Sequence, residues 1–229
     1  MAWGSGVLAG LALVVAVLYG LRFAAREEKG PVAAAVKTGS TGLLALALAG
    51  QGGGGWFWLV PLGLALGALG DLCLALKGER AFLAGVGAFG LGHLAYAGGF
   101  LLRSGERGFD GVSPGEALAL AGLVGLLVST EVWLAPRTGA LRGPVRGYVA
   151  LIGLMGVAAV LLPAVQGQGV LRSGAALFIL SDLMLAVQIF VVRDPVVRRG
   201  LALALWPAYW AGQALIGWGA LAFWGAATG

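Results

Sequence analysis

The sequence predicts an all-α membrane protein, a single domain over residues 1–229 that crosses the bilayer with eight helices. Of the 229 residues, 59% are hydrophobic and only 11% are charged, whereas a soluble domain carries about 25% charged residues. The mean hydropathy is +0.93. The apolar residues fall into eight segments of about 20 residues, the length that spans a hydrocarbon core. Helices are expected because isolated strands would leave backbone groups unpaired in lipid.

Short breaks that contain glycine, proline or charged residues separate the predicted spans, and none is long enough to form a soluble domain. The first apolar segment has its charges after the apolar run instead of before it. We therefore interpret it as a retained helix and not as a signal peptide. The predicted spans are residues 2–23, 31–50, 56–77, 81–102, 114–135, 144–163, 169–192 and 200–225.

Basic residues gather in alternate loops. Loops one, three, five and seven hold eleven of them, and the even loops and termini hold three, Arg103, Arg107 and Arg172. This bias places the odd loops in the cytoplasm and both termini outside. It also explains the net charge of +5 without a nucleic-acid partner, and the composition suits a multi-pass protein of a bacterial inner membrane. The eleven are Arg22, Arg26, Lys29, Lys77, Arg80, Arg137, Arg142, Arg146, Arg193, Arg198 and Arg199.

Two short segments resemble each other. Residues 70–75 read Gly-Asp-Leu-Cys-Leu-Ala, and residues 181–186, which lie 111 positions later, read Ser-Asp-Leu-Met-Leu-Ala. The offset corresponds to four predicted helices. It therefore indicates a parallel 4+4 repeat, with Asp71 and Asp182 at related places.

Ionisable residues inside membrane spans are costly and are candidates for function. At a rise of ~1.5 Å per residue, they lie roughly 6 to 18 Å from the predicted cytoplasmic edge, together with Tyr148 and Tyr209. A polar pocket in the cytoplasmic half is therefore expected. The ionisable candidates are Lys37, Asp71, His93, Glu131 and Asp182.

Asp71 and Asp182 suggest acid–base chemistry. Two carboxylates close together in a low-dielectric site do not both ionise readily, so the pair offers a proton donor and a carboxylate. The alternative is that each only pairs with Lys37 or accepts hydrogen bonds between helices. His93 fits either proton transfer or packing, and Glu131 fits either catalysis or pairing with a loop arginine. One Cys and one His do not supply a His/Cys zinc site, so we expect neither a metal nor a cofactor.

These residues also carry a resemblance to a family. The segment with Asp71, Phe82, Phe89, His93 and Tyr96 resembles the first signature of the YhhN-like lysoplasmalogenase family. Ser181-Asp182 with Leu185-Ala186 resembles the second signature. Tyr148, Tyr209 and Gln213 fit weaker blocks, and Lys37 matches a family lysine, although Thr38 stands where proline usually follows. The resemblance covers about residues 30 to 217.

The resemblance implies a membrane hydrolase that cleaves the vinyl-ether bond of a lysophospholipid to give a fatty aldehyde and glycerophospho-choline or -ethanolamine. Protonating the β-carbon of an enol ether gives an oxocarbenium ion that water attacks, which requires an acid, a negative charge and a base. Our hypothesis is that Asp71 and Asp182 share these roles, with His93 or Glu131 assisting. The expected substrate-binding residues are Lys37 and Tyr148 at the lipid phosphate, with Tyr96, Tyr209, Gln213 and Ser181.

Three alternatives stay open at this point. An intramembrane aspartyl protease also uses two membrane aspartates, but Asp182 follows Ser181 where that class has tyrosine. A proton-coupled transporter would use buried Asp, His and Lys, although the outer half of the predicted bundle offers few such groups. The third alternative is a structural protein whose polar residues only join helices.

Overall fold

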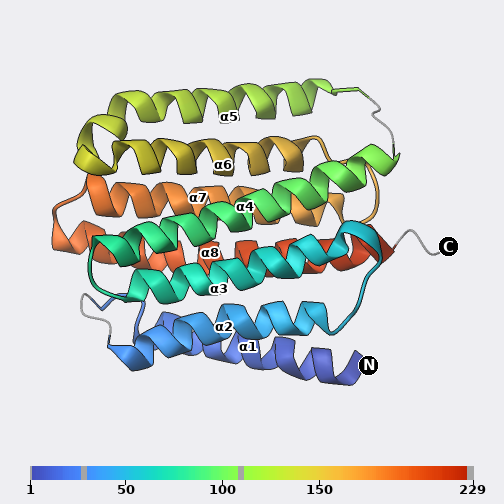
Figure 1. The fold of residues 1–229 in the computed structure, drawn as a ribbon, viewed down its shortest axis with the longest axis horizontal. Helices are drawn as coiled ribbons and strands as arrows, with labels where there is room; N and C mark the ends of the chain where they lie inside the picture. The colour runs from blue at the N-terminus through green and yellow to red at the C-terminus, as the bar shows by residue number, and fades with distance from the viewer. Residues whose placement is uncertain (1, 27–29, 108–110, 226–229) are drawn as a thin grey trace.

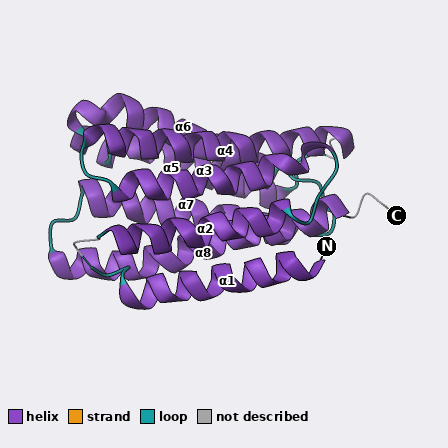
Figure 2. Cartoon of the chain, turned by 60° about the horizontal axis from the view of Figure 1, so that its bottom comes forward, coloured by secondary structure: helices purple, strands orange, loops and turns teal. Residues whose placement is uncertain are grey.

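The chain is an all-helical bundle (Figures 1 and 2), seen in a computed structural model that describes residues 2–26, 30–107 and 111–225. Within these ranges eight long helices follow one another, joined by short loops and 3₁₀ turns. The predicted polytopic helical bundle is therefore confirmed. The helices are α1 (Ala2–Arg22), α2 (Pro31–Ala49), α3 (Leu59–Ala75), α4 (Glu79–Arg107), α5 (Pro114–Trp133), α6 (Arg142–Val160), α7 (Gln168–Phe190) and α8 (Pro195–Gly225).

Two helices are longer than the spans predicted for them. Helix α8 starts at Pro195 instead of residue 200, because the Asp194 carboxylate accepts hydrogen bonds from the backbone N–H groups of Val196 (2.7 Å) and Val197 (3.1 Å). Such a cap starts a helix, and proline is favoured at its first position. Helix α4 continues to Arg107, and an Arg103–Glu106 ion pair at 2.8 Å supports its last turns.

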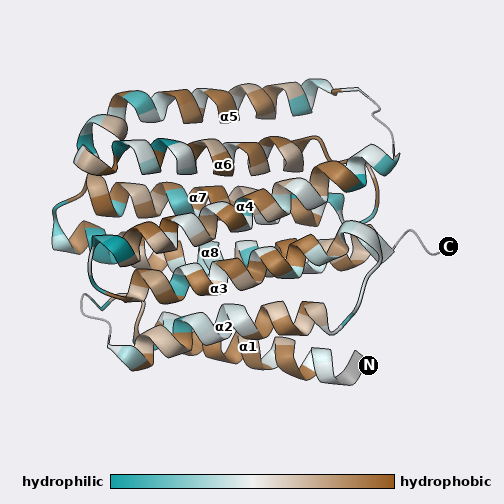
Figure 3. Ribbon diagram, viewed as in Figure 1, coloured by the Kyte–Doolittle hydropathy of each residue, from teal (hydrophilic) through white to brown (hydrophobic). Residues whose placement is uncertain are grey.

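Among the described residues, the seven helices α1 to α7 are long and apolar enough to cross a membrane. Helix α8 differs because Trp, Tyr, Gln and Pro interrupt its apolar residues. Trp206, Tyr209 and Gln213 are nevertheless buried. Helix α8 thus turns one face with polar groups into the bundle, while Leu203 and Trp218 on it are exposed. Figure 3 shows hydrophobic residues along the helices and hydrophilic ones mainly towards their ends.

The two halves of the chain pack in the same order. In α1–α4 and again in α5–α8, each helix contacts the next one. Contacts of α4 with α6 and of α8 with α2 join the halves, and α1 and α5 lie at opposite edges (Figure 1). This arrangement is what a parallel 4+4 repeat predicts. Helix α1 begins and α8 ends at the same end of the bundle (Figure 1). Lys29, one of the residues behind the predicted orientation, lies outside the described residues.

Close helix crossings depend on glycine in both halves. A Cβ atom at Gly174 of α7 would lie 2.7 Å from the backbone nitrogen of Ile216 and 2.8 Å from the carbonyl oxygen of Gly212, both on α8. In the α3–α4 crossing, a Cβ at Gly92 would lie 3.2 Å from the carbonyl oxygen of Gly63. Gly63 and Gly174 are separated by the same 111 residues as the two aspartates. The repeat therefore extends beyond the six similar positions around each aspartate.

Replacing Gly174 with alanine tests the α7–α8 crossing. The added methyl group would meet backbone atoms that cannot rotate away, so Gly174→Ala should destabilise the protein by about 1–3 kcal/mol. Thermal unfolding of purified protein in detergent measures this change. Gly169→Ala is the matched control, because nothing lies within 4 Å of a Cβ at this position of the same helix. An unchanged melting temperature for Gly174→Ala would contradict the close crossing.

Candidate active site

Asp71 of α3 lies at the centre of a buried cluster. Its side chain is fully buried, and Lys37 Nζ of α2 lies 2.7 Å from its Oδ1 atom. The Tyr209 hydroxyl of α8 donates to Oδ2 at 2.9 Å, and the Thr41 hydroxyl donates to the same atom at 3.1 Å. A buried carboxylate that has a cation and two hydroxyl donors is compensated for the loss of water. Asp71 is therefore held as a charged partner of Lys37.

The cluster continues towards α4 through Gln213. The Gln213 side-chain amide donates to the Tyr209 oxygen at 3.3 Å, and the Tyr96 hydroxyl donates to Gln213 Oε1 at 2.5 Å. Tyr96 and Gln213 are buried. These two residues therefore fix Tyr209 against Asp71.

Asp182 of α7 forms a second cluster of a different kind. The Tyr148 hydroxyl of α6 donates to Asp182 Oδ2 at 2.6 Å, and His93 Nε2 of α4 lies 3.2 Å from the same oxygen. His93 Nε2 also lies 2.9 Å from the Tyr148 oxygen. His93 is fully buried, whereas the Asp182 side chain is 13% exposed. Within the described part of the chain, no Lys or Arg forms an ion pair with Asp182.

His93 contacts other side chains through both of its ring nitrogens. Its Nδ1 atom lies 3.3 Å from the Met155 sulfur, which is a weak hydrogen-bond acceptor. The other ring nitrogen, Nε2, faces Asp182 and Tyr148. The imidazole therefore bridges Asp182 and Tyr148 through one ring nitrogen and contacts the Met155 sulfur through the other.

Aromatic rings separate the two clusters. The Phe178 ring centroid lies 4.6 Å from that of His93 and 5.4 Å from that of Tyr209. Phe89 packs edge-on against both Phe178 and Tyr209. Asp71 and Asp182 thus bind different hydrogen-bond partners, and among the described residues no hydrogen bond joins the two carboxylates directly.

The two clusters nevertheless correspond to each other within the repeat. Tyr148 follows Lys37 by 111 residues, the same offset that separates Asp182 from Asp71. In each cluster the second helix of a half supplies the first partner of the aspartate. The fourth helix of the opposite half supplies another, Tyr209 for Asp71 and His93 for Asp182. The first half therefore places the Lys37 ammonium beside Asp71, and the second half places the Tyr148 phenol beside Asp182.

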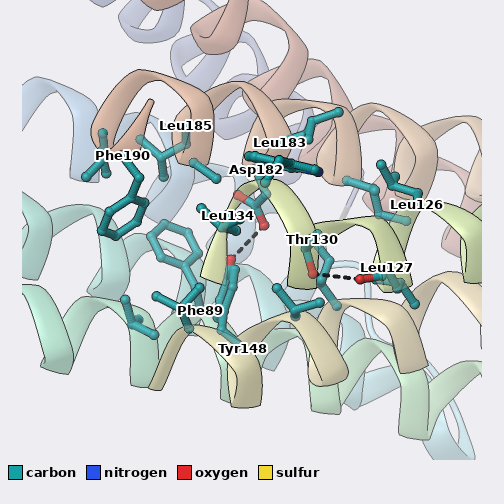
Figure 4. Close-up of a pocket in the computed structure, with 18 of the residues that line it drawn as sticks. Phe89, Leu126, Leu127, Thr130, Leu134, Tyr148, Asp182, Leu183, Leu185 and Phe190 are labelled. Atoms are coloured by element: carbon teal, nitrogen blue, oxygen red, sulfur yellow. Dashed lines mark hydrogen bonds between the residues drawn. The ribbon is translucent and has the colours of Figure 1, made fainter. Parts of the chain in front are cut away.

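Asp182 and Tyr148 line an apolar cavity of about 100 Å³ between α4, α5, α6 and α7. Figure 4 shows the two side chains directed at each other, with Phe89 and Leu134 beside them. Lys37 and Asp71 line a separate cavity of about 180 Å³. The two cavities have four wall residues in common, which are Leu74, Phe82, Leu185 and Ile189.

Two larger cavities lie next to these two, one beside the Asp71 cavity and one beside the Asp182 cavity. Next to the Asp71 cavity, across Leu74 and Ala75, lies a cavity of about 890 Å³ at the odd-loop end. Next to the Asp182 cavity, across Leu126, Ile179 and Leu183, lies an apolar cavity of about 550 Å³. This series of cavities thus passes from basic to apolar walls, with both aspartates in the middle. The basic residues of the first are Arg26, Lys77, Arg198 and Arg199.

Some predicted site residues lie away from the clusters. Glu131 of α5 is 45% exposed, and Arg146 Nε of α6 donates to both of its oxygens, at 2.8 and 3.0 Å. The Ser181 hydroxyl donates to the Phe178 carbonyl at 2.7 Å and stays within its own helix. Lys37 and Tyr148, expected together at a phosphate, belong to different clusters.

Other residues of the clusters were not predicted. Thr41 lies one helical turn after Lys37, so its position on the same face of α2 was a usable signal. Met155 and Phe178 also contact His93, and as apolar residues of predicted spans they gave no sign of this in the sequence. Among the described residues, no group of three His, Cys, Asp or Glu side chains is arranged to hold a metal ion.

The chain was compared with known proteins. It is 32% identical over 164 residues to the lysoplasmalogenase of Mycobacterium bovis, and equally to that of Mycobacterium tuberculosis. The alignment covers 69% of this chain and 58% of each relative, so the chain spans less than two thirds of their length. No solved structure matches it. The model of the YhhN family matches residues 32–220, a range that includes both aspartate clusters, and the chain therefore belongs to the YhhN family.

Proposed function

We propose that this protein hydrolyses the vinyl-ether bond of lysoplasmalogens to a fatty aldehyde and a glycerophospho-choline or -ethanolamine. The names of the mycobacterial relatives support this reaction. The structural observation that carries the proposal is the cluster of Asp182, Tyr148 and His93, of which Asp182 and Tyr148 line a cavity between basic and apolar neighbours. A lipid with one chain and a phosphate headgroup has the same succession of charged, reactive and apolar parts.

Asp182 acts as the general acid in this proposal. Its carboxyl group lines the cavity beside Tyr148, and among the described residues no Lys or Arg ion pair has to break for it to take up a proton. In its protonated form it donates its proton to the β-carbon of the vinyl ether. The π electrons form the new C–H bond, and the α-carbon becomes an oxocarbenium ion. The resulting Asp182 carboxylate stabilises this cation at short range.

Water completes the reaction. It attacks the α-carbon and passes a proton back to Asp182, with His93 holding the proton when the carboxylate remains charged. The product is a hemiacetal. Transfer of its hydroxyl proton to the ether oxygen breaks the C–O bond and releases the aldehyde and the glycerol hydroxyl. The cluster ends in its starting protonation state, so no other reagent is consumed.

Lys37 contributes substrate binding in this proposal, and Asp71 positions it. The Lys37 side chain is 20% exposed, lines the second cavity and points one N–H group at Asp71. A lysine ammonium carries three donors, so the others can bind a phosphate oxygen. Tyr209 and Thr41 hold Asp71 and thereby fix the direction of Lys37. Binding of the phosphate here would leave the vinyl ether on the Asp182 side of the shared wall.

The separation of the aspartates argues against a protease. An aspartyl protease uses two carboxylates on one water molecule, with one proton shared between them. Here the rings of Phe89 and Phe178 lie between the clusters. The geometry thus favours one acid and one ion-paired carboxylate over a catalytic dyad.

Replacing Asp182 with asparagine tests the role of the acid. The amide keeps the shape and a hydrogen bond to Tyr148 but cannot protonate carbon, so aldehyde release should fall by about 10²–10⁴-fold. Purified protein is incubated with a vinyl-ether lysolipid and with its saturated ether analogue, and aldehyde is measured. Glu131→Gln is the matched control, since this carboxylate pairs with Arg146 away from both clusters, and it should keep its activity. Full activity of a folded Asp182→Asn protein would overturn the mechanism.

The Lys37–Asp71 pair can be tested by single and double replacement. Asp71→Asn leaves the Lys37 ammonium without its partner and should destabilise the protein by about 3 kcal/mol. The double variant Lys37→Met with Asp71→Asn removes both charges and should recover most of this loss, measured by thermal unfolding. If Lys37 binds phosphate, the recovered protein should still show a KM raised by about tenfold or more. If both the stability and the KM recover in the double variant, the Lys37–Asp71 pair has only a structural role and Lys37 does not bind phosphate.

A further inference from the structure

The apolar cavity of about 550 Å³ next to Asp182 is a groove that is partly open to the surroundings, since its lining residues Ala119, Ala176 and Leu180 are exposed. It lies between α5, α6 and α7 and adjoins the Asp182 cavity, with which it shares the lining residues Leu126, Ile179 and Leu183. Its walls are mainly apolar side chains of these three helices. The charged residues that line it are Glu116 and Arg172, which pair with each other at the end furthest from Asp182.

Weak packing of α5 leaves this space open. Helix α5 packs mainly against α6, and ion pairs hold it near each end, Glu116 to Arg172 of α7 and Glu131 to Arg146 of α6. Between these pairs the cavity wall includes the small residues Ala119, Gly156 and Ala176. Leu123 of α5 and Ile179 of α7 reach into the space over Gly156, while the small side chains of Ala119 and Ala176 leave the groove between α5 and α7 open beside them.

Arg172 closes the far end of the cavity. Its guanidinium donates to Glu116 and also to the carbonyl oxygens of Ala159, at 3.2 Å, and Leu162, at 2.9 Å. Ala159 lies in the last turn of α6 and Leu162 lies just beyond the end of the helix. Arg172 therefore joins three segments at one point. A hydrocarbon chain gains nothing by reaching past such a polar group.

The length of the cavity can be read from the two helices that bound it. Asp182 and Arg172 are ten residues apart on α7, a rise of ~15 Å, and Thr130 and Glu116 are fourteen residues apart on α5, a rise of ~21 Å. An extended hydrocarbon advances about 1.3 Å per carbon, given C–C bonds of about 1.5 Å. The space beyond Asp182 thus matches about 12 to 16 carbons, the size of one long lipid chain.

We propose that this cavity binds the single hydrocarbon chain of an ether lysolipid, and that the Glu116–Arg172 pair sets the longest chain that reaches full activity. The proposal rests on the proposed function for the identity of the lipid. Because the two cavities share lining residues, a chain in this groove would have its first carbons close to the acid. The last carbons would meet the Glu116–Arg172 pair, so an overlong chain would push the vinyl ether away from Asp182.

A bulky residue inside the cavity tests this proposal. Ala119→Phe fills the cavity about 10 Å beyond Leu126 along α5. It should lower kcat/KM for a 16-carbon alkenyl lysolipid by about tenfold or more. For an 8-carbon substrate, kcat/KM should stay within about twofold of the value for the unchanged protein. Ala176→Phe, on the opposite wall, should act in the same way. Ala121→Phe is the matched control, because Ala121 is exposed on α5 but does not line the cavity; its chain-length profile should equal that of the unchanged protein.

Binding experiments separate this proposal from the proposed reaction. Saturated alkyl-ether lysolipids of 8 to 18 carbons are titrated against the protein in competition with a fluorescent lysolipid, which needs no catalysis. Preference for long chains, lost in Ala119→Phe and kept in Ala121→Phe, supports the cavity as the chain site even if no aldehyde is ever released. Equal affinity at all lengths, or equal losses in folded Ala119→Phe and Ala121→Phe, overturns it. Aldehyde release with no dependence on chain length would leave the reaction intact and the chain site rejected.

Discussion

The burial of two carboxylates inside a membrane bundle is the constraint on which the rest of the structure depends. A charge in this environment costs several kcal/mol unless donors surround it. The chain meets this cost in two ways, with Lys37, Thr41 and Tyr209 around Asp71, and with Tyr148 and His93 around Asp182. These donors come from four helices other than those that carry the aspartates. Satisfying the two carboxylates therefore fixes how α2, α4, α6 and α8 pack around α3 and α7.

The repeat explains why the clusters are related in position but differ in chemistry. Lys37 and Tyr148 occupy equivalent places, 111 residues apart, yet one supplies a permanent positive charge and the other a neutral hydroxyl. The two related positions thus place an ammonium beside one aspartate and a phenol beside the other.

Much of the fold followed from the sequence because a membrane imposes strong rules on composition and length. The eight spans matched the helices to within a few residues, except where Asp194 starts α8 early and where α4 continues to Arg107. The same rules selected Asp71, His93 and Asp182 as candidates for the site. The sequence could not show that Phe89 and Phe178 separate the aspartates, since an aromatic residue in an apolar segment has the same pattern whether it faces lipid, core or a cluster. Nor could it predict the cavity along α5, which depends on how loosely that helix packs.

Phe89 and Phe178 also place hydrocarbon between the Tyr209 and His93 rings. Phe178 packs against both, and Phe89 packs against Phe178 and Tyr209. Neither phenyl ring can donate or accept a strong hydrogen bond, so no chain of hydrogen bonds passes through these two side chains from one network to the other. Each network can therefore rearrange its hydrogen bonds without these rings relaying the change.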